Sequence, residues 1–308
     1  MTPYKMDPSS IGRKLSSFGF FASVAALVFV SVANAQTLYV ANSVNSTISK
    51  ITPDGSVSTF VSGILDPVAL AFDGSGNLFV ALPGSSNTIS EITPGGSVST
   101  FASGLNQPTG LAFDGSGDLF AANWAIGTIS KITPGGAVST FASGLNYPWG
   151  LAFNSSGDLF VANNGGSTIS KITPGGSVST FASGLPNPVG LAFNSSGDLF
   201  VANANNGTIS EITPDGSVST FASGLGSPGG QGLAFNSSGD LFVANITGLV
   251  GTISEITPDG SVSTFASGLY GPEDVAFGTA VPEPTTYAPI LGLATLGFVV
   301  LRRRFARK

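Results

Sequence analysis

The chain has 308 residues, of which 42 are glycine and 19 proline, and its 42% of hydrophobic residues excludes an intrinsically disordered protein. It contains no cysteine, so disulfides and thiolate metal sites are excluded, and no histidine, the commonest general base and transition-metal ligand. We therefore expect no catalytic residue, no metal site and no cofactor. Short bursts of Gly, Ser, Thr, Val and Phe, without long helical periodicity between the two ends, predict an all-β protein of many short strands.

Residues 1–35 have the three parts of a secretory signal peptide. Arg13 and Lys14 precede a short apolar core, and the sequence Ala-Asn-Ala forms a small-x-small cleavage site that ends at Ala35. We predict cleavage between Ala35 and Gln36. A retained membrane helix is the less favoured alternative, because the apolar core is shorter than the roughly 20 residues that span a bilayer.

A repeating unit fills residues 36–280, which we predict to be one domain. Its most regular feature is Leu-Ala-Phe, or Val-Ala-Phe in the last unit, and the phenylalanines are spaced by 41, 40, 40, 42 and 42 residues. These phenylalanines are Phe72, Phe113, Phe153, Phe193, Phe235 and Phe277. Each unit offers four strand-sized pieces joined by turns rich in Gly and Asn. Four antiparallel strands in a unit of this length indicate one blade of a β-propeller.

The strands do not alternate cleanly between hydrophobic and polar residues. Ile129 and Ile132, for example, fall on opposite faces of the same predicted strand. We expect both to be buried, because each blade of a propeller packs against a neighbour on either side.

The repeats also predict how many blades there are and how the ring closes. Thr-Ile-Ser occurs six times, once in each unit. The first unit lacks its innermost strand, whereas residues 272–277 form an innermost strand without a unit of its own. We therefore predict a six-bladed propeller of four-stranded blades, whose first blade combines residues 37–64 with the C-terminal strand, residues 272–278.

The sequence Gly-Asp-Leu-Phe-Val-Ala-Asn followed by Thr-Ile-Ser resembles the NHL repeat family. The resemblance covers residues 37–277 and implies a β-propeller. The chain departs from the family in having Asn after Val-Ala, where the family commonly has Asp. These residues are Asn42, Asn163, Asn203 and Asn245. We expect a turn-capping role that either residue type would fill.

Residues 281–308 carry a short motif, an apolar run of 15 residues and an arginine cluster, in that order. The motif and cluster residues are Pro282, Glu283, Pro284, Arg302, Arg303 and Arg304. This arrangement resembles a PEP-CTERM sorting signal, which implies processing by an exosortase-like enzyme during export, typically in bacteria that make exopolysaccharide. We expect the apolar run to be a helix that anchors the chain in the membrane until it is processed, with the arginines on the cytoplasmic side. An ordinary tail anchor would give the same orientation.

The repeats differ from one another mainly in two classes of loop. One class joins the second and third strands of a blade, and the other connects one blade to the next. A four-stranded meander places both classes on the same side, which we call the diversified face. The opposite side carries nearly invariant turns, and we call it the uniform face.

Six residues near the junction of the third and fourth blades are candidate ligand-binding residues on the diversified face. They are Trp124, Trp149, Tyr147, Asn123, Asn146 and Asn163. Aromatic rings flanked by amides suit a sugar, which offers apolar C–H patches and hydroxyl groups. The alternative is that Trp149 only plugs the top of the central channel, where other blades have Val68, Thr109 and Val189.

Two further patterns argue against charged partners. Residues 36–281 contain three lysines and no arginine against fifteen acidic residues, a net charge of −12. A domain this acidic has no basic stripe for phosphate, so we expect no nucleic-acid partner. The sequence Asp114-Gly-Ser-Gly-Asp118 resembles a calcium loop but lacks the further carboxylates that such a loop needs, so we predict a turn.

These features predict a non-catalytic protein of the cell envelope or surface, exported by its signal peptide. We expect it to bind a surface protein or exopolysaccharide through the diversified face. Streptogramin-lyase-like propellers depend on a histidine, which this chain lacks. The alternative function is a metal-dependent hydrolase similar to the lactonase propellers, with Glu273 and Asp274 among its possible metal ligands.

Overall fold

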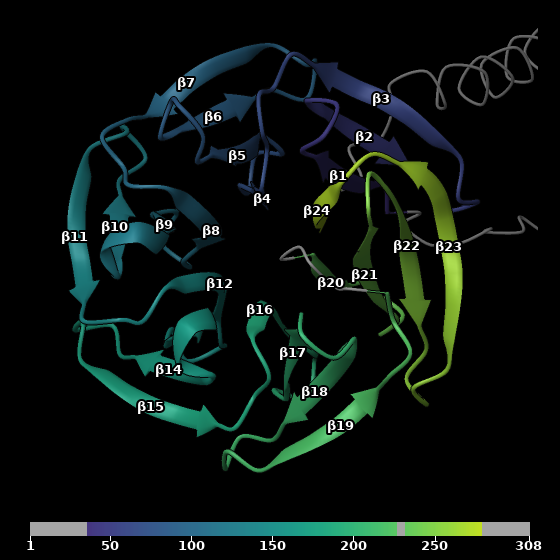
Figure 1. Cartoon of the computed structure of the whole chain (residues 1–308). Coiled ribbons are helices and arrows are strands. Elements are labelled where there is room, and N and C mark those ends of the chain that lie inside the picture. The colour runs from purple at the N-terminus through teal and green to yellow at the C-terminus, as the bar shows by residue number, and fades with distance from the viewer. Residues whose placement is uncertain (1–35, 227–231, 279–308) are drawn as a thin grey trace, which may run out of the picture. The chain divides into compact units, whose positions relative to one another are not determined.

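The computed structural model describes residues 36–226 and 232–278, which form 24 strands arranged as six four-stranded sheets. The sheets stand around a common axis as the blades of a propeller, each with one strand at the centre and one at the rim (Figure 1). The described helices are two single-turn 3-10 helices, η2 (Trp124–Ile126) and η3 (Asn164–Gly166). The predicted all-β, six-bladed propeller is confirmed.

From the centre outward, the blades contain the following strands. Blade 1 has β24 (Pro272–Phe277), β1 (Leu38–Asn42), β2 (Thr47–Ile51) and β3 (Val57–Ser62), and blade 2 has β4 (Ala69–Phe72), β5 (Leu78–Leu82), β6 (Thr88–Ile92) and β7 (Val98–Ala102). Blade 3 has β8 (Pro108–Phe113), β9 (Leu119–Asn123), β10 (Thr128–Ile132) and β11 (Val138–Ser143), and blade 4 has β12 (Pro148–Phe153), β13 (Leu159–Asn163), β14 (Thr168–Ile172) and β15 (Val178–Ser183). Blade 5 has β16 (Pro188–Phe193), β17 (Leu199–Asn203), β18 (Thr208–Ile212) and β19 (Val218–Ala222), and blade 6 has β20 (Leu233–Phe235), β21 (Leu241–Thr247), β22 (Val250–Ile256) and β23 (Val262–Leu269).

Tight turns on the uniform face link the first strand of a blade to the second. In blade 3, Asp114 Oδ1 accepts hydrogen bonds from Ser116 N (2.8 Å) and Asp118 N (2.9 Å). Gly117 in this turn has a φ of +85°, a conformation that glycine adopts without the steric cost of a side chain. The turn predicted at this sequence is confirmed.

The core lies between the blades, on both faces of their middle strands. Ile129 and Ile132 of β10 are both fully buried, as predicted, because blades 2 and 4 cover the two faces of blade 3. Phe120 of β9 packs edge-to-face on Phe141 of its own blade at 4.9 Å and on Phe153 of the next blade at 5.0 Å. Equivalent ring contacts recur around the described ring. Burial of apolar surface and edge-to-face packing therefore hold neighbouring blades together.

The ring closes through the C-terminal strand. β24 pairs antiparallel with β1, so that Leu38 lies opposite Phe277 and Val40 opposite Val275. Figure 1 shows the two strands side by side at the centre, one from each end of the described chain. The predicted composition of the first blade is confirmed.

The other segments named from the sequence lie outside the described residues. These are the signal peptide, the C-terminal apolar run and the sorting-motif residues. Within residues 36–226 and 232–278, no helix is long and apolar enough to cross a membrane.

Candidate ligand-binding face

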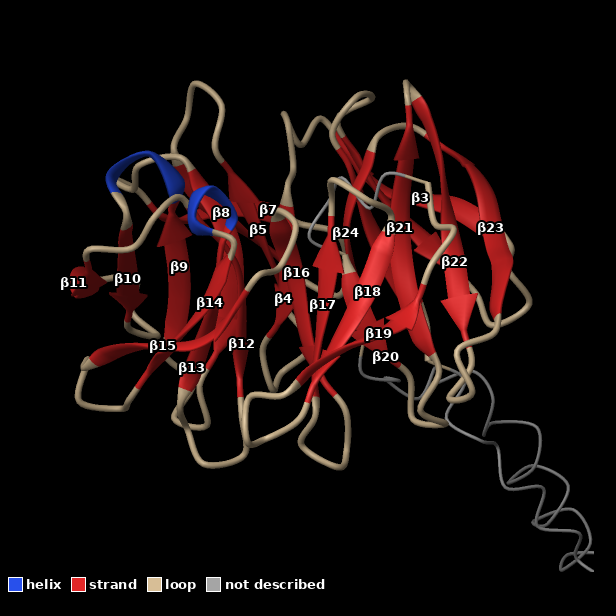
Figure 2. Cartoon of the chain, turned by 60° about the horizontal axis from the view of Figure 1, so that its bottom comes forward, coloured by secondary structure: helices blue, strands red, loops and turns tan. Residues whose placement is uncertain are grey.

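The two variable loop classes lie together on one side of the propeller. Trp124 N, at the start of η2, donates a 3.1 Å hydrogen bond to the carbonyl of Gln107 in the connection that precedes blade 3. Asn164 N, at the start of η3, does the same to the carbonyl of Tyr147, also at 3.1 Å. Figure 2 shows both 3-10 helices at the same end of the strands. The predicted diversified face is confirmed by these contacts.

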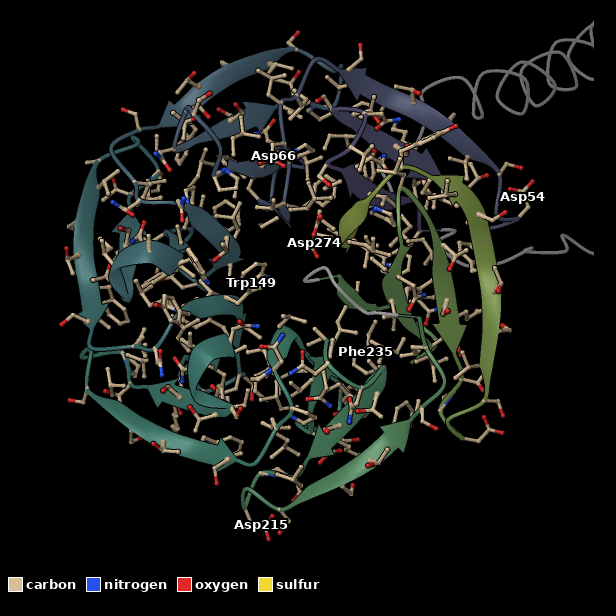
Figure 3. The ribbon with its side chains drawn as sticks, viewed as in Figure 1. Asp54, Asp66, Trp149, Asp215, Phe235 and Asp274 are labelled. Carbon is tan, nitrogen blue, oxygen red and sulfur yellow. The ribbon has the colours of Figure 1, made fainter. Side chains whose placement is uncertain are left out.

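Three of the predicted site residues form one aromatic cluster on this face. The ring of Trp124 lies 5.0 Å from that of Tyr147, tilted by 31°, and 6.5 Å from that of Trp149, nearly perpendicular to it. Tyr147 is 48% exposed, whereas both tryptophans are partly buried. Trp149 lies at the inner end of its blade, facing the central axis (Figure 3), and packs against the apolar cluster that contains Val189. We call Trp124, Tyr147 and Trp149 the aromatic platform.

The two tryptophans of the platform bury polar groups without hydrogen-bond partners, which an apolar side chain closing the channel would not do. The indole nitrogens of Trp124 and Trp149 are both buried without a hydrogen-bond acceptor among the described residues. A buried donor without a partner costs about 1–3 kcal/mol. Blades 2 and 5 have Val68 and Val189 at the position of Trp149, and valine has no N–H that would incur that cost. Plugging the channel therefore does not by itself account for tryptophan there.

Asn123 and Asn163 have a different role from the aromatic platform. Asn123 is 2% exposed, and its Nδ2 donates to Thr128 Oγ1 (3.1 Å) and Ser130 Oγ (2.9 Å) on the neighbouring strand. Asn163 of blade 4 is 3% exposed, and its Nδ2 donates the equivalent bonds within its own blade, to Thr168 Oγ1 (3.1 Å) and Ser170 Oγ (2.8 Å). The repeated asparagine thus joins the second and third strands of a blade through side chains. The expected turn-capping role is wrong for Asn163, whose side chain makes no capping hydrogen bond to the helix that follows it. Its amide nitrogen is used inside the blade and does not face solvent.

Asn146, by contrast, is exposed beside the platform. Its side chain and the ring of Tyr147 both lie against Gly165 of η3, where an added Cβ would come within 2.7 Å of Asn146 Oδ1. No larger residue fits at Gly165 without displacing them. The short η3 helix therefore fixes the position of Asn146 and Tyr147.

The structure gives Asp274, at the centre of the ring, a more specific role than the sequence predicted. Asp274 stands where blades 3, 4 and 5 have glycine, and it lines a central cavity of about 90 Å³ together with leucines of the innermost strands. Its Oδ2 accepts a 2.7 Å hydrogen bond from Leu70 N, and its Oδ1 accepts one of 2.8 Å from Val275 N. Burial raises the pKa of Asp274 to about 7, despite these two bonds. The sequence does mark this site, because Asp274 is an acidic residue at a position where the innermost strands of the other blades have Gly or Ala.

Glu273 lies beside Asp274 on the closing strand. Its Oε1 accepts a 3.0 Å hydrogen bond from Ser43 Oγ, and burial raises its pKa to about 7. Among the described residues, no group of three or more His, Cys, Asp or Glu side chains is placed to hold a metal ion. The two carboxylates are thus engaged with the protein's own donors at the closure of the ring.

Comparisons with known protein families match the repeats and the C-terminal residues to two different sequence models. The sequence model of the virginiamycin B lyase family matches residues 23–279, and that of the PEP-CTERM protein-sorting motif matches residues 280–304. A comparison with curated protein sequences finds no match.

Solved structures with the same fold come from enzymes and from other proteins. A catalytically inactive virginiamycin B lyase from Staphylococcus aureus with quinupristin is 18% identical, with a TM-score of 0.59 over 76% of this chain and 86% of that one. A chain of a nidogen/laminin complex is 18% identical, with a TM-score of 0.68 over 80% and 99%. A putative gluconolactonase is 15% identical, with a TM-score of 0.60 over 70% and 85%. At these identities the similarity establishes the propeller fold alone.

Proposed function

The chain belongs to the virginiamycin B lyase family, and we propose that it is a non-catalytic member that binds a component of the cell envelope through its diversified face. The PEP-CTERM motif marks it for export, for sorting to the cell envelope and for recognition by an exosortase-type processing enzyme. An exported polysaccharide or a surface protein is therefore the class of partner that the propeller meets.

The chemistry of the family argues against lyase activity in this chain. The Staphylococcus aureus enzyme is described as catalytically inactive when one histidine is replaced by alanine. This chain has no histidine at any position. A reaction that depends on an imidazole is not available to it.

The aromatic platform is the observation that carries the proposed binding function. It joins three aromatic rings on the face where the repeats differ, and it retains two buried indole N–H groups without acceptors. Aromatic rings of this kind stack on the apolar face of a sugar, and the exposed amide of Asn146 lies within the same group of loops. We favour a polysaccharide over a protein partner for this reason.

A glycan array tests the proposal with the wild-type protein and the Trp124→Ala and Trp149→Val variants. We expect the wild type to bind a set of glycans that both variants lose. If the wild type binds no glycan, the carbohydrate version of the proposal is wrong, and capture of partners from the native cell surface would then identify a protein ligand.

A metal-dependent hydrolase is the second candidate, and the two carboxylates at the channel favour it. The fold similarity to a putative gluconolactonase is compatible with that function. However, Asp274 already accepts two backbone N–H bonds and Glu273 one hydroxyl bond. Tightly bound stoichiometric calcium in the purified protein would favour the hydrolase, whereas its absence after dialysis against calcium would exclude a resident metal of that kind.

A further inference from the structure

A second cavity lies on the uniform face, between blades 3 and 4. Its volume is about 480 Å³, within the roughly 300–1,000 Å³ of small-molecule sites. Its rim consists of two turns, one from each blade, which contribute Ser116, Ser155 and Ser156, together with Pro174. The cavity is at the opposite end of the same blade junction from the aromatic platform.

The floor of this cavity is aromatic. Phe120 forms its centre, and Phe141 and Phe153 pack edge-to-face on either side of it at 4.9 and 5.0 Å. Phe120 is 3% exposed, while the other two rings are partly exposed toward the cavity. The floor therefore offers apolar surface mainly from the partly exposed rings of Phe141 and Phe153, which Phe120 holds in place by edge-to-face packing.

The polar wall of the cavity is built around one ammonium group. Lys131 Nζ lies 2.8 Å from Asp118 Oδ2, 4.0 Å from Asp114 Oδ2 and 5.5 Å from the centre of the Phe120 ring. The hydrogen bond to Asp118 raises the pKa of Lys131, so the ammonium stays charged. One cation and two carboxylates leave this wall with a net charge of −1, in a domain that is itself strongly acidic.

This combination selects a particular class of ligand. A phosphate or carboxylate ligand would meet an excess of negative charge, and a purely apolar ligand would bury the serine hydroxyls and the ion pair without hydrogen bonds. A neutral pyranose has an apolar C–H face for the phenylalanines and a rim of hydroxyl groups for Ser155, Ser156 and the charged side chains. We propose that the cavity between blades 3 and 4 on the uniform face is a binding site for one or two units of a neutral sugar.

The equivalent junction between blades 5 and 6 provides a control within the same chain. It keeps the three rings, Phe200, Phe221 and Phe235, and the same Asn-Ser-Ser-Gly turn. Glu211 replaces the lysine there, beside Asp198. That junction therefore lacks the cation that offsets the carboxylates, and we expect it to bind sugar poorly.

The test uses the full chain, purified in a detergent without a sugar headgroup. Neutral oligosaccharides and uronic-acid oligosaccharides of the same length are compared on an array, and the best ligand is then titrated by calorimetry. Ser156→Trp blocks the proposed cavity from its exposed rim, and Ser238→Trp makes the same change at the control junction. Lys131→Glu places an acid where blade 5 naturally has Glu211, so the strand is expected to fold with it, although blade 5 has Asn194 at the position of Asp114.

We expect neutral-sugar binding at this cavity, which Ser156→Trp and Lys131→Glu should each weaken at least about tenfold, a loss of about 1.4 kcal/mol. Ser238→Trp should leave the affinity within about twofold. The inference is wrong if no neutral oligosaccharide binds, if uronic-acid ligands bind as well as neutral ones, or if the two tryptophan variants behave alike. Binding that Trp149→Val abolishes and Ser156→Trp does not would instead assign the sugar to the aromatic platform, and so separates the two proposals.

Discussion

Asp274 Oδ2 accepts a 2.7 Å hydrogen bond from the backbone nitrogen of Leu70, a residue 204 positions earlier in the chain. The bond joins the innermost strands of blades 1 and 2 at the point where the C-terminal strand closes the ring. Figure 3 shows Asp274 beside the central axis, far from the rim residues Asp54 and Asp215. The closing strand thus contributes a buried carboxylate that the other described blades do not have at this position.

Protonation of this carboxylate should make stability depend on pH. Burial raises the pKa of Asp274 and of Glu273 to about 7 in the folded protein, above the ordinary values of 3.8 and 4.5. The folded state therefore binds more protons than the unfolded state between these values. The free energy of unfolding should fall as the pH rises from about 4 to about 7, by on the order of 1–4 kcal/mol. Urea unfolding across this range measures the slope.

The matched variant for that measurement is Asp274→Ala, because blade 2 has Ala69 at the equivalent position. It should be less stable at low pH, since Leu70 N loses its acceptor, but its stability should vary less with pH. A slope identical to that of the wild type would contradict the assignment to Asp274.

Trp149→Val and Tyr147→Asn should abolish ligand binding at the platform without destabilising the fold. Valine occupies the position of Trp149 in blade 5, and Asn187 occupies that of Tyr147 with the same left-handed backbone, φ +62° against +50°. Asparagine tolerates this conformation better than tyrosine, and valine leaves no indole N–H unpaired. Thermal unfolding should show an unchanged or higher melting temperature in both variants. A large fall in melting temperature would mean that the aromatic side chains are structural.

Asn163→Ala should destabilise the protein by about 1–3 kcal/mol, because Thr168 and Ser170 lose a buried donor. Asn163→Leu should cost less, since blade 2 naturally has Leu82 at this position. Asn146→Ala, at the exposed site, serves as the neutral control. Chemical denaturation of the three variants measures the order, and equal losses for Asn163→Ala and Asn146→Ala would contradict the buried role of Asn163.

A chain that ends at Gly271 lacks β24 and should not unfold cooperatively, because blade 1 is left with three strands and an open inner edge. A chain that ends at Gly278 keeps the strand, and its unfolding should match that of the longer protein. Adding a synthetic peptide of residues 272–278 should restore cooperative unfolding to the shorter chain. Cooperative unfolding of the shorter chain without the peptide would show that closure by β24 is dispensable.

The sequence alone was sufficient for the number of blades, their strands, the turn at Asp114 and the origin of the closing strand. These features follow from local periodicity and turn chemistry, which repeat in register from Phe72 to Phe277 and are therefore visible along the chain. Only the tertiary structure decided that Asn163 is buried while Asn146 is exposed, that Asp274 binds Leu70, and that Phe120, Phe153 and Lys131 surround one cavity. Those relationships join different strands or different blades, and they depend on packing distances across the ring that no spacing within a repeat encodes.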